Sequence, residues 1–156
     1  MLSYRLIERI EKNWETLANG VLADVQRDTR TPHYRELADA EIRERAQDLT
    51  RNLGYWLTGG NRAQLAARYE SLGRRRAAEG VPLYEVLRKL QLLKRRLMGF
   101  AREQNLDQTA LEIHAENELH QAMDQFFDEV IYSVAKGYAG DSPVFEIERD
   151  WATMRV

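Results

Sequence analysis

Apolar residues recur three and four positions apart along most of this 156-residue chain. That spacing places them on one face of an α-helix, whereas a half-buried β-strand needs strict alternation of apolar and polar residues, which we do not find. The three prolines, Pro32, Pro82 and Pro143, fall where the helical pattern breaks, as expected for a residue that cannot continue a helix. The sequence therefore predicts an all-α fold.

The apolar spacing and its interruptions predict five helices. We expect them over residues 3–27, 39–58, 61–80, 82–104 and 107–138. Polar side chains that can cap a first helical turn stand at the start of three of them: Asp39, Asn61 and Asp107.

Length and composition fit a single folded domain. About 44% of the residues are apolar and 31% are charged, which is enough apolar material for a core and too much for a disordered chain. We assign residues 1–140 to one domain and residues 141–156 to a C-terminal tail or linker. Cysteine is absent, and no apolar run reaches signal-peptide length or the roughly 18 residues of a membrane span. We therefore expect a cytoplasmic protein without membrane contact.

The net charge of −2 conceals an uneven distribution. Residues 68–103 carry 10 basic and 4 acidic side chains, whereas residues 107–150 carry 2 basic and 11 acidic ones. The simplest interpretation is that a basic helix pair packs beside an acidic helix in the same domain. A charged surface for a partner and head-to-tail pairing of two subunits are the alternatives.

The predicted helix over residues 107–138 has more apolar surface than one contact can cover. Its larger apolar side chains span an arc of about 140°, which widens to about 220° with two alanines included, whereas a helix with one solvated side needs roughly 100°. Either this helix is the centre of the fold, or part of it meets a second subunit. For the second case we predict a homodimer interface that includes Met123, Phe127 and Ile131, with Trp14 of the first helix nearby.

Three ionisable side chains are candidates for a ligand pocket: Lys94, His114 and His120. Lys94 lies within about 60° of the centre of its helix's apolar stripe. It must therefore reach the edge, or pair with Asp124, Asp128 or an anionic ligand. His114 and His120 lie on different faces of one helix, and neither follows the Glu-x-x-His step of di-iron bundles. We expect no metal and no cofactor, and keep haem ligation by either histidine as an alternative.

Motifs of catalysis and of nucleic-acid binding are weak or missing. The chain has no glycine-rich phosphate loop and no Gly-x-Ser-x-Gly elbow, so we predict that it is not an enzyme. Two basic runs, residues 74–76 and 94–96, can contact phosphates. Arg88, Arg95 and Arg102, however, are seven residues apart and have the pattern of a solvated helix stripe. We expect no nucleic-acid partner and keep this function as an alternative.

Two segments carry a resemblance to a known family. Residues 33–37 have the sequence His-Tyr-Arg-Glu-Leu, and the run 72–90 begins Leu-Gly-Arg-Arg-Arg and continues through Gly-Val-Pro-Leu. They resemble the N-terminal sensor domain of RsbR-type proteins, the stressosome co-antagonists of the kinase RsbT, over roughly residues 7–138. The motif positions are His33, Tyr34, Gly73, Arg74, Gly80 and Pro82.

The resemblance implies a globin-like bundle of five to six helices that holds no haem, is usually dimeric and passes a signal to an output domain or signalling partner. It transfers no catalytic residue to this chain. Nothing long enough for an output domain follows residue 138, so a stand-alone version and an excised piece both stay open. We predict a non-catalytic sensory or regulatory domain that acts through dimerisation and through binding a partner or small ligand. A haem-based gas sensor and a basic nucleic-acid-binding regulator are the alternatives.

Overall fold

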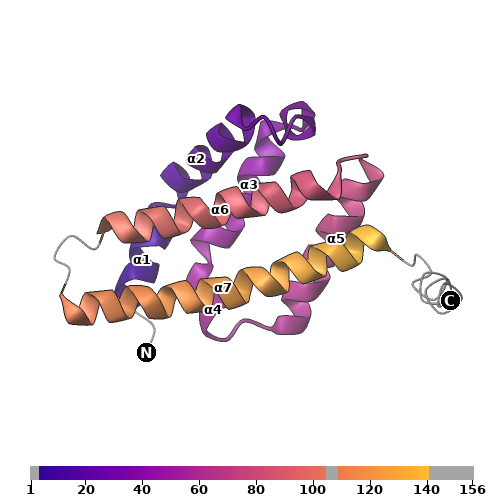
Figure 1. Cartoon of the computed structure of the whole chain (residues 1–156). Helices are drawn as coiled ribbons and strands as arrows, with labels where there is room; N and C mark the ends of the chain where they lie inside the picture. Colours follow the sequence, from indigo (N-terminus) through magenta and orange to yellow (C-terminus); the bar gives the residue numbers. More distant parts are fainter. Residues whose placement is uncertain (1–3, 105–108, 141–156) are drawn as a thin grey trace, which may run out of the picture.

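The structure, a computed structural model, describes residues 4–104 and 109–140, which form seven α-helices and one 3-10 turn (Figure 1). In chain order the elements are α1 (Tyr4–Lys12), α2 (Trp14–Arg27), η1 (His33–Glu36), α3 (Asp39–Arg51), α4 (Leu53–Thr58), α5 (Arg62–Ala78), α6 (Leu83–Gln104) and α7 (Ala110–Ala139). These residues contain no strand, so the predicted all-α class is confirmed. The number of helices is compatible with a globin-like bundle. The predicted tail, residues 141–156, lies outside the described residues.

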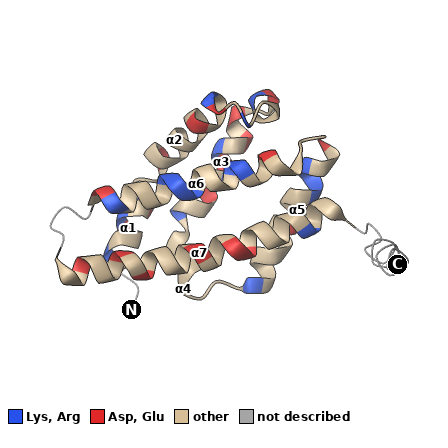
Figure 2. Cartoon of the chain, viewed as in Figure 1, with Lys and Arg blue, Asp and Glu red and all other residues tan. Residues whose placement is uncertain are grey.

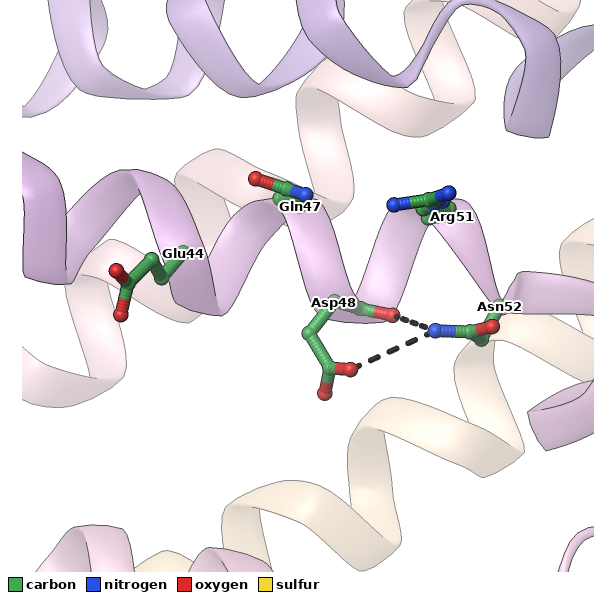
Figure 3. A pocket seen from close by; sticks show the side chains of 5 residues that line it. All are labelled: Glu44, Gln47, Asp48, Arg51 and Asn52. Atoms are coloured by element: carbon green, nitrogen blue, oxygen red, sulfur yellow. Dashed lines mark hydrogen bonds between the residues drawn. The ribbon is translucent and has the colours of Figure 1, made fainter.

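Two asparagines divide helices that the apolar spacing predicts as continuous. Asn13 separates α1 from α2, and Asn52 separates α3 from α4. Each side-chain amide donates to the carbonyl oxygen four residues earlier, Asn13 Nδ2 to Arg9 O at 2.8 Å and Asn52 Nδ2 to Asp48 O at 2.9 Å (Figure 3). Because an asparagine side chain competes with the backbone for such carbonyls, it favours a break in the helix. The first two predicted helices are therefore four.

The helix starts agree only in part with the predicted caps. Asn61 caps α5, since its Oδ1 accepts from two backbone N–H groups of the first turn at 2.9 and 3.2 Å. The prediction for Asp39 is wrong, because Asp39 is already the first residue of α3 and its carboxylate accepts from Gln26 of α2. Asp107 lies outside the described residues, and the N-cap of α7 is Thr109.

The turn between α5 and α6 explains two motif residues, Gly80 and Pro82. Gly80 has a φ of +75°, a left-handed conformation that favours glycine. The N–H groups of Gly80 and Val81 donate to the carbonyls of Ala77 and Arg76 at 3.1 and 3.0 Å, which is the bond pair of a Schellman helix end. Pro82 directly precedes α6, where its missing N–H costs little. These residues turn the chain sharply from α5 into α6.

Two glycines allow α5 and α7 to cross with their backbones in contact. A Cβ on Gly137 would lie 1.9 Å from the carbonyl oxygen of Glu70, and one on Gly73 would lie 2.1 Å from that of Val134. Both distances are far shorter than any real contact of a Cβ, so only a residue without a side chain fits at either place. The motif residue Gly73 therefore marks a helix crossing.

The wide apolar arc of α7 is covered by the chain itself, because α7 packs against α4, α5 and α6 (Figure 1). Met123 and Phe127 are only 0% and 1% exposed. In this conformation they offer no surface to a second subunit, which narrows the predicted interface to Ile131 and Trp14. Both of these are partly exposed, and the Trp14 ring lies 5.8 Å from the guanidinium carbon of Arg51. The homodimer itself stays a prediction.

Helix α6 is basic and lies between helices that supply carboxylates on both sides (Figure 2). Toward α2, Arg96 donates to both oxygens of Asp24 at 2.8 Å. Toward α7, Lys94 pairs with Asp124. Two further pairs have the same directions: Arg88 with Asp28 at 2.9 Å, and Arg102 with Glu116 at 3.6 Å. The arrangement agrees with basic and acidic helices packed within one domain.

Candidate functional site

Charged side chains are buried at one place in the part of the chain that the structure describes. Arg76 on α5 and Glu85 and Lys89 on α6 are 1%, 0% and 4% exposed. A buried charge is costly unless it is paired and hydrogen-bonded, so three together in a small domain form the candidate site. We call these residues, with their neighbours Tyr34 of η1 and Glu41 of α3, the polar cluster.

Arg76 is held by two carboxylates and one aromatic ring. Its Nη1 donates to Glu41 Oε1 at 2.8 Å and to the two oxygens of Glu79 at 3.0 and 3.2 Å. Its guanidinium carbon lies 5.6 Å from the centre of the Tyr34 ring, a cation–π distance. Partial burial acts to raise the pKa of Glu41, but the hydrogen bond and charge of Arg76 outweigh it and hold that pKa below its ordinary value. Glu41 is therefore ionised at neutral pH.

Glu85 is tied to η1 by His33. The backbone N–H of His33 donates to Glu85 Oε1 at 2.8 Å, and its ring Nδ1 contacts Oε2. These contacts satisfy a carboxylate that has no exposed surface. Beside it, Tyr34 is 1% exposed, and burial raises its pKa to about 12. The His33-Tyr34 motif thus joins η1 to α5 and α6.

Lys89 is the least satisfied member of the polar cluster. It forms no hydrogen bond and no ion pair with the described residues, although it is only 4% exposed. Burial and the positive charges of Arg76 and Arg45 lower the pKa of Lys89 to about 7, against the opposing charge of Glu41. Lys89 therefore changes its protonation near neutral pH, a property that is common at functional sites.

The lysine that the apolar stripe singles out, Lys94, is not the buried one. Its side chain is 33% exposed and pairs with Asp124, one of the partners considered for it. Lys89 escapes sequence reasoning because α6 is covered by α2 and α5 as well as by α7, so its buried arc is wider than its main stripe. The sequence does contain one signal that Lys89 is buried, which is its helical position. Lys89 follows Val86 by three residues and precedes Leu93 by four, so it shares a helix face with both.

Within the arginine run of α5, the buried residue is Arg76, and the motif position Arg74 is exposed. Arg76 stands three residues after Gly73 and four after Leu72, which puts it on the buried face of the helix. The composition of the run does not distinguish its three arginines, but helical spacing from neighbouring apolar positions does.

Two of the predicted ligand residues, Lys94 and His120, line one groove between α6 and α7. The groove has a volume of about 490 Å³, and Arg95, Met98 and Arg102 also line it. Its walls thus combine several cationic groups with an apolar thioether. The structure therefore brings together two of the three side chains that the sequence predicts for a pocket.

The third, His114, lies apart from this groove and is 69% exposed, with its Nε2 3.0 Å from Glu118 Oε1. The His120 side chain is 48% exposed, and its Nε2 lies 3.7 Å from Asp124 Oδ2. An axial haem ligand needs an enclosed distal pocket, so the exposure of both rings gives no support to the haem alternative.

Outside the polar cluster and the groove, the described residues offer neither a metal site nor a membrane span. No group of three or more His, Asp or Glu side chains that could hold a metal ion occurs in residues 4–104 and 109–140. No helix in those ranges is long and apolar enough to cross a membrane. A hollow of about 430 Å³ on α3 is lined by side chains of mixed charge, and the hydrogen bonds drawn there join Asn52 to Asp48 (Figure 3).

Comparison with protein-family models puts this helical domain in the class of stressosome-type signalling sensor domains. Residues 15–141 match the RsbT co-antagonist protein rsbRD N-terminal domain. The match spans most of the chain, so the chain belongs to this family, as the motifs in residues 33–37 and 72–90 predict. Members are regulatory domains that are not known as catalysts and act with signalling partners in the stressosome. No curated protein and no solved structure matches the chain.

Proposed function

We propose that this chain is a non-catalytic, non-haem sensory domain that works as a homodimer and responds to a small ligand or a protein partner. Its membership of a sensor-domain family supports the signalling role. The observation that carries the dimer is the opposite charge of α6 and α7 on one open face of the molecule (Figure 2).

That face is formed by α6 and α7, which lie side by side and antiparallel (Figure 1). Arg95 and Arg102 of α6 line its central groove. Asp124 pairs with α6 across the groove, and Asp128 lies one helical turn further along the same row of α7. Arg95 and Asp128 form no ion pair with the described residues. Ile131 adds a partly buried apolar side chain at this edge of the core.

A second copy of the chain is complementary to this face. A two-fold axis parallel to the two helices would place α6 of one subunit over α7 of its partner, with two equivalent contacts. Each basic helix would then meet an acidic one, which favours association and fixes the register. The result is a four-helix arrangement whose central contact pairs the charged rows of α6 and α7, with Ile131 as an apolar contact at its edge.

The basic residues of α6 support protein pairing better than nucleic-acid binding. Arg88 and Arg96 are already engaged by carboxylates, Arg88 by the α2 C-cap Asp28 and Arg96 by Asp24 within α2. A nucleic-acid surface needs several free cations in a row to bind successive phosphates. Nucleic-acid binding therefore stays the weaker alternative, and a cytoplasmic location stays a prediction.

Light scattering on the eluate of a size-exclusion column, at tens of micromolar, tests the dimer. We expect the mass of two chains for the wild type. Arg95→Glu should raise the dimer Kd by about tenfold or more, because it sets like charges against each other. The double variant Arg95→Glu/Asp128→Arg should restore much of the affinity, and Arg74→Glu on α5 is the matched control. A wild-type chain that stays monomeric throughout this range would remove the proposal.

A further inference from the structure

One buried hydrogen-bond donor in the polar cluster, Arg76 Nε, has no acceptor among the residues that the structure describes. Nη1 of the same guanidinium is engaged by Glu41 and Glu79. On the neighbouring helix, the Lys89 residue is only 4% exposed and takes part in no hydrogen bond or ion pair there. Buried polar groups nearly always have a partner, so the unpartnered Nε and the unpaired ammonium point to a ligand that accepts.

The charges around these donors are unbalanced. The positive charges of Arg76 and Arg45 both act against the ammonium of Lys89. Arg45 forms no ion pair within the described ranges either. On the negative side, Glu41 and Glu79 are each shared between Arg75 and Arg76, and Glu85 is already satisfied by η1. Positive charge is therefore in excess in a region of low polarity, where a bound anion is strongly favoured.

A hollow between α3 and α5 shares Glu41 with this region. It has a volume of about 440 Å³, and Glu41 and Arg45 line it. The same two side chains act on the interior: Glu41 accepts from Arg76, and the charge of Arg45 acts on Lys89. Of the other lining carboxylates, Asp48 is engaged by Arg68 and Glu44 is exposed. A solute in the hollow thus contacts Glu41 and Arg45, the two lining side chains that also act on Arg76 and Lys89.

We propose that the polar cluster binds a small oxyanion, held by Lys89, Arg76 and Arg45 beside this hollow. The proposal rests on the proposed sensory function and names its class of ligand. An oxyanion has enough acceptor atoms to bond Arg76 Nε and Lys89 Nζ at once, and such charge-assisted bonds are strong. A chloride ion also accepts several hydrogen bonds, but all of them must converge on one atom, whereas an oxyanion offers each donor a separate oxygen.

Binding of the oxyanion is coupled to protonation of Lys89. The negative charge of the oxyanion offsets the repulsion between Lys89 and the two arginines, so the lysine is held in its ammonium form when the anion is bound. Other titratable and charged groups around the site contribute to the electrostatic background: His33, Tyr34, Glu41, Arg45, Arg75, Arg76, Glu79 and Glu85. Above neutral pH, the complex therefore takes up as much as one proton per chain.

Thermal unfolding of the full chain tests the proposal. We would titrate phosphate, sulfate, acetate and bicarbonate at pH 7.5, with chloride added to hold the ionic strength constant. At least one oxyanion should raise the Tm of the wild type in a saturable way, by about 3 °C or more, and the four arms separate tetrahedral from planar ligands. Lys89→Met and Arg45→Gln should lose the rise. Lys94→Met, which removes a lysine of the same helix outside the cluster, should keep it.

Either of two thermal-unfolding results would overturn the oxyanion site. One is that none of the four anions raises the Tm of the wild type. The other is that wild type, Lys89→Met and Arg45→Gln respond equally, which would mark a general salt effect. Calorimetry of the active anion in two buffers of different ionisation enthalpy should show proton uptake, and uptake of none would also contradict the proposal. Dimerisation is measured independently by light scattering. If the chain dimerises but binds none of the anions, this inference fails and the proposed function stands.

Discussion

Gly73 and Arg76 stand one turn apart on α5, yet the helix packs in opposite ways at the two positions. At Gly73, the backbone of α5 touches the backbone of α7 with no side chain between them. At Arg76, the same helix buries a long cation between η1, α3 and α6. The first contact depends on shape alone, whereas the second depends on how many charges lie nearby and on their protonation. We call the α5–α7 contact at Gly73 the fixed seam, and the packing of α5 around Arg76 the adjustable seam.

The two regions are also connected. The hydroxyl of Tyr138, in the last turn of α7, donates to the carbonyl of Val81 at 2.8 Å. Val81 lies in the turn that follows the arginine run, and its own N–H donates to the carbonyl of Arg76. A change in the packing of the polar cluster can therefore reach the end of α7 through two hydrogen bonds.

The largest expected effect comes from breaking the fixed seam. In Gly137→Ala the new Cβ would lie 1.9 Å from Glu70 O, so the helices must separate. We expect a loss of about 3 kcal/mol or more in the free energy of unfolding, measured by urea denaturation. Gly99→Ala is the matched control, because a Cβ at Gly99 meets nothing within 4 Å. That change should be neutral or stabilise by up to about 1 kcal/mol. An unchanged urea midpoint for Gly137→Ala would refute the close crossing.

Removing Arg76, the cation of the adjustable seam, should lower the free energy of unfolding somewhat less than Gly137→Ala does. Arg76→Ala leaves Glu41 and Glu79 without their main partner and opens a space beside Tyr34. The free energy of unfolding should fall by about 3 kcal/mol, again by urea denaturation. Arg74→Ala, two residues earlier and exposed, should change it by less than about 0.5 kcal/mol. Equal effects of the two substitutions would show that Arg76 is not buried in solution.

The smallest expected effect is a pH dependence of stability, which should come from the adjustable seam and not from the fixed one. The pKa of Lys89 is lowered to about 7 in the folded chain, against about 10.4 for an unfolded lysine. Between these values the unfolded state binds more protons, so wild-type stability rises with pH, and below pH 7 the full cost of the buried charge is present. Relative to Lys89→Met, we expect a gain of about 1 kcal/mol per pH unit from pH 7 to pH 9, measured by urea denaturation in chloride buffers.

This pH window avoids the tyrosines, which ionise only near pH 10 in an unfolded chain. Gly99→Ala, which leaves every titratable group in place, should follow the wild-type slope. Parallel pH profiles for wild type and Lys89→Met would mean that the lysine is solvated or paired in the folded chain.

The all-α class, the cap at Asn61 and the sharp turn at Gly80 and Pro82 follow from the sequence alone. The physical reason is that they depend on neighbours within about one helical turn, through apolar spacing, side-chain caps and the φ preference of glycine. The family motifs are local in the same sense, and the family that they predict is confirmed by the family match. The breaks at Asn13 and Asn52 were within reach of the same local reasoning, because an asparagine bonds its own helix.

Burial, in contrast, was decided only by the tertiary structure. Sequence spacing shows which side chains share a helix face, but it does not show how many neighbouring helices cover that face. For this reason sequence spacing singles out Lys94 and misses Lys89. It also predicts Met123 and Phe127 at a subunit interface, although α5 and α6 already cover α7. Which charges are desolvated depends on contacts between residues far apart in the chain, such as Glu41 with Arg76 and His33 with Glu85. Those contacts form only when the helices assemble.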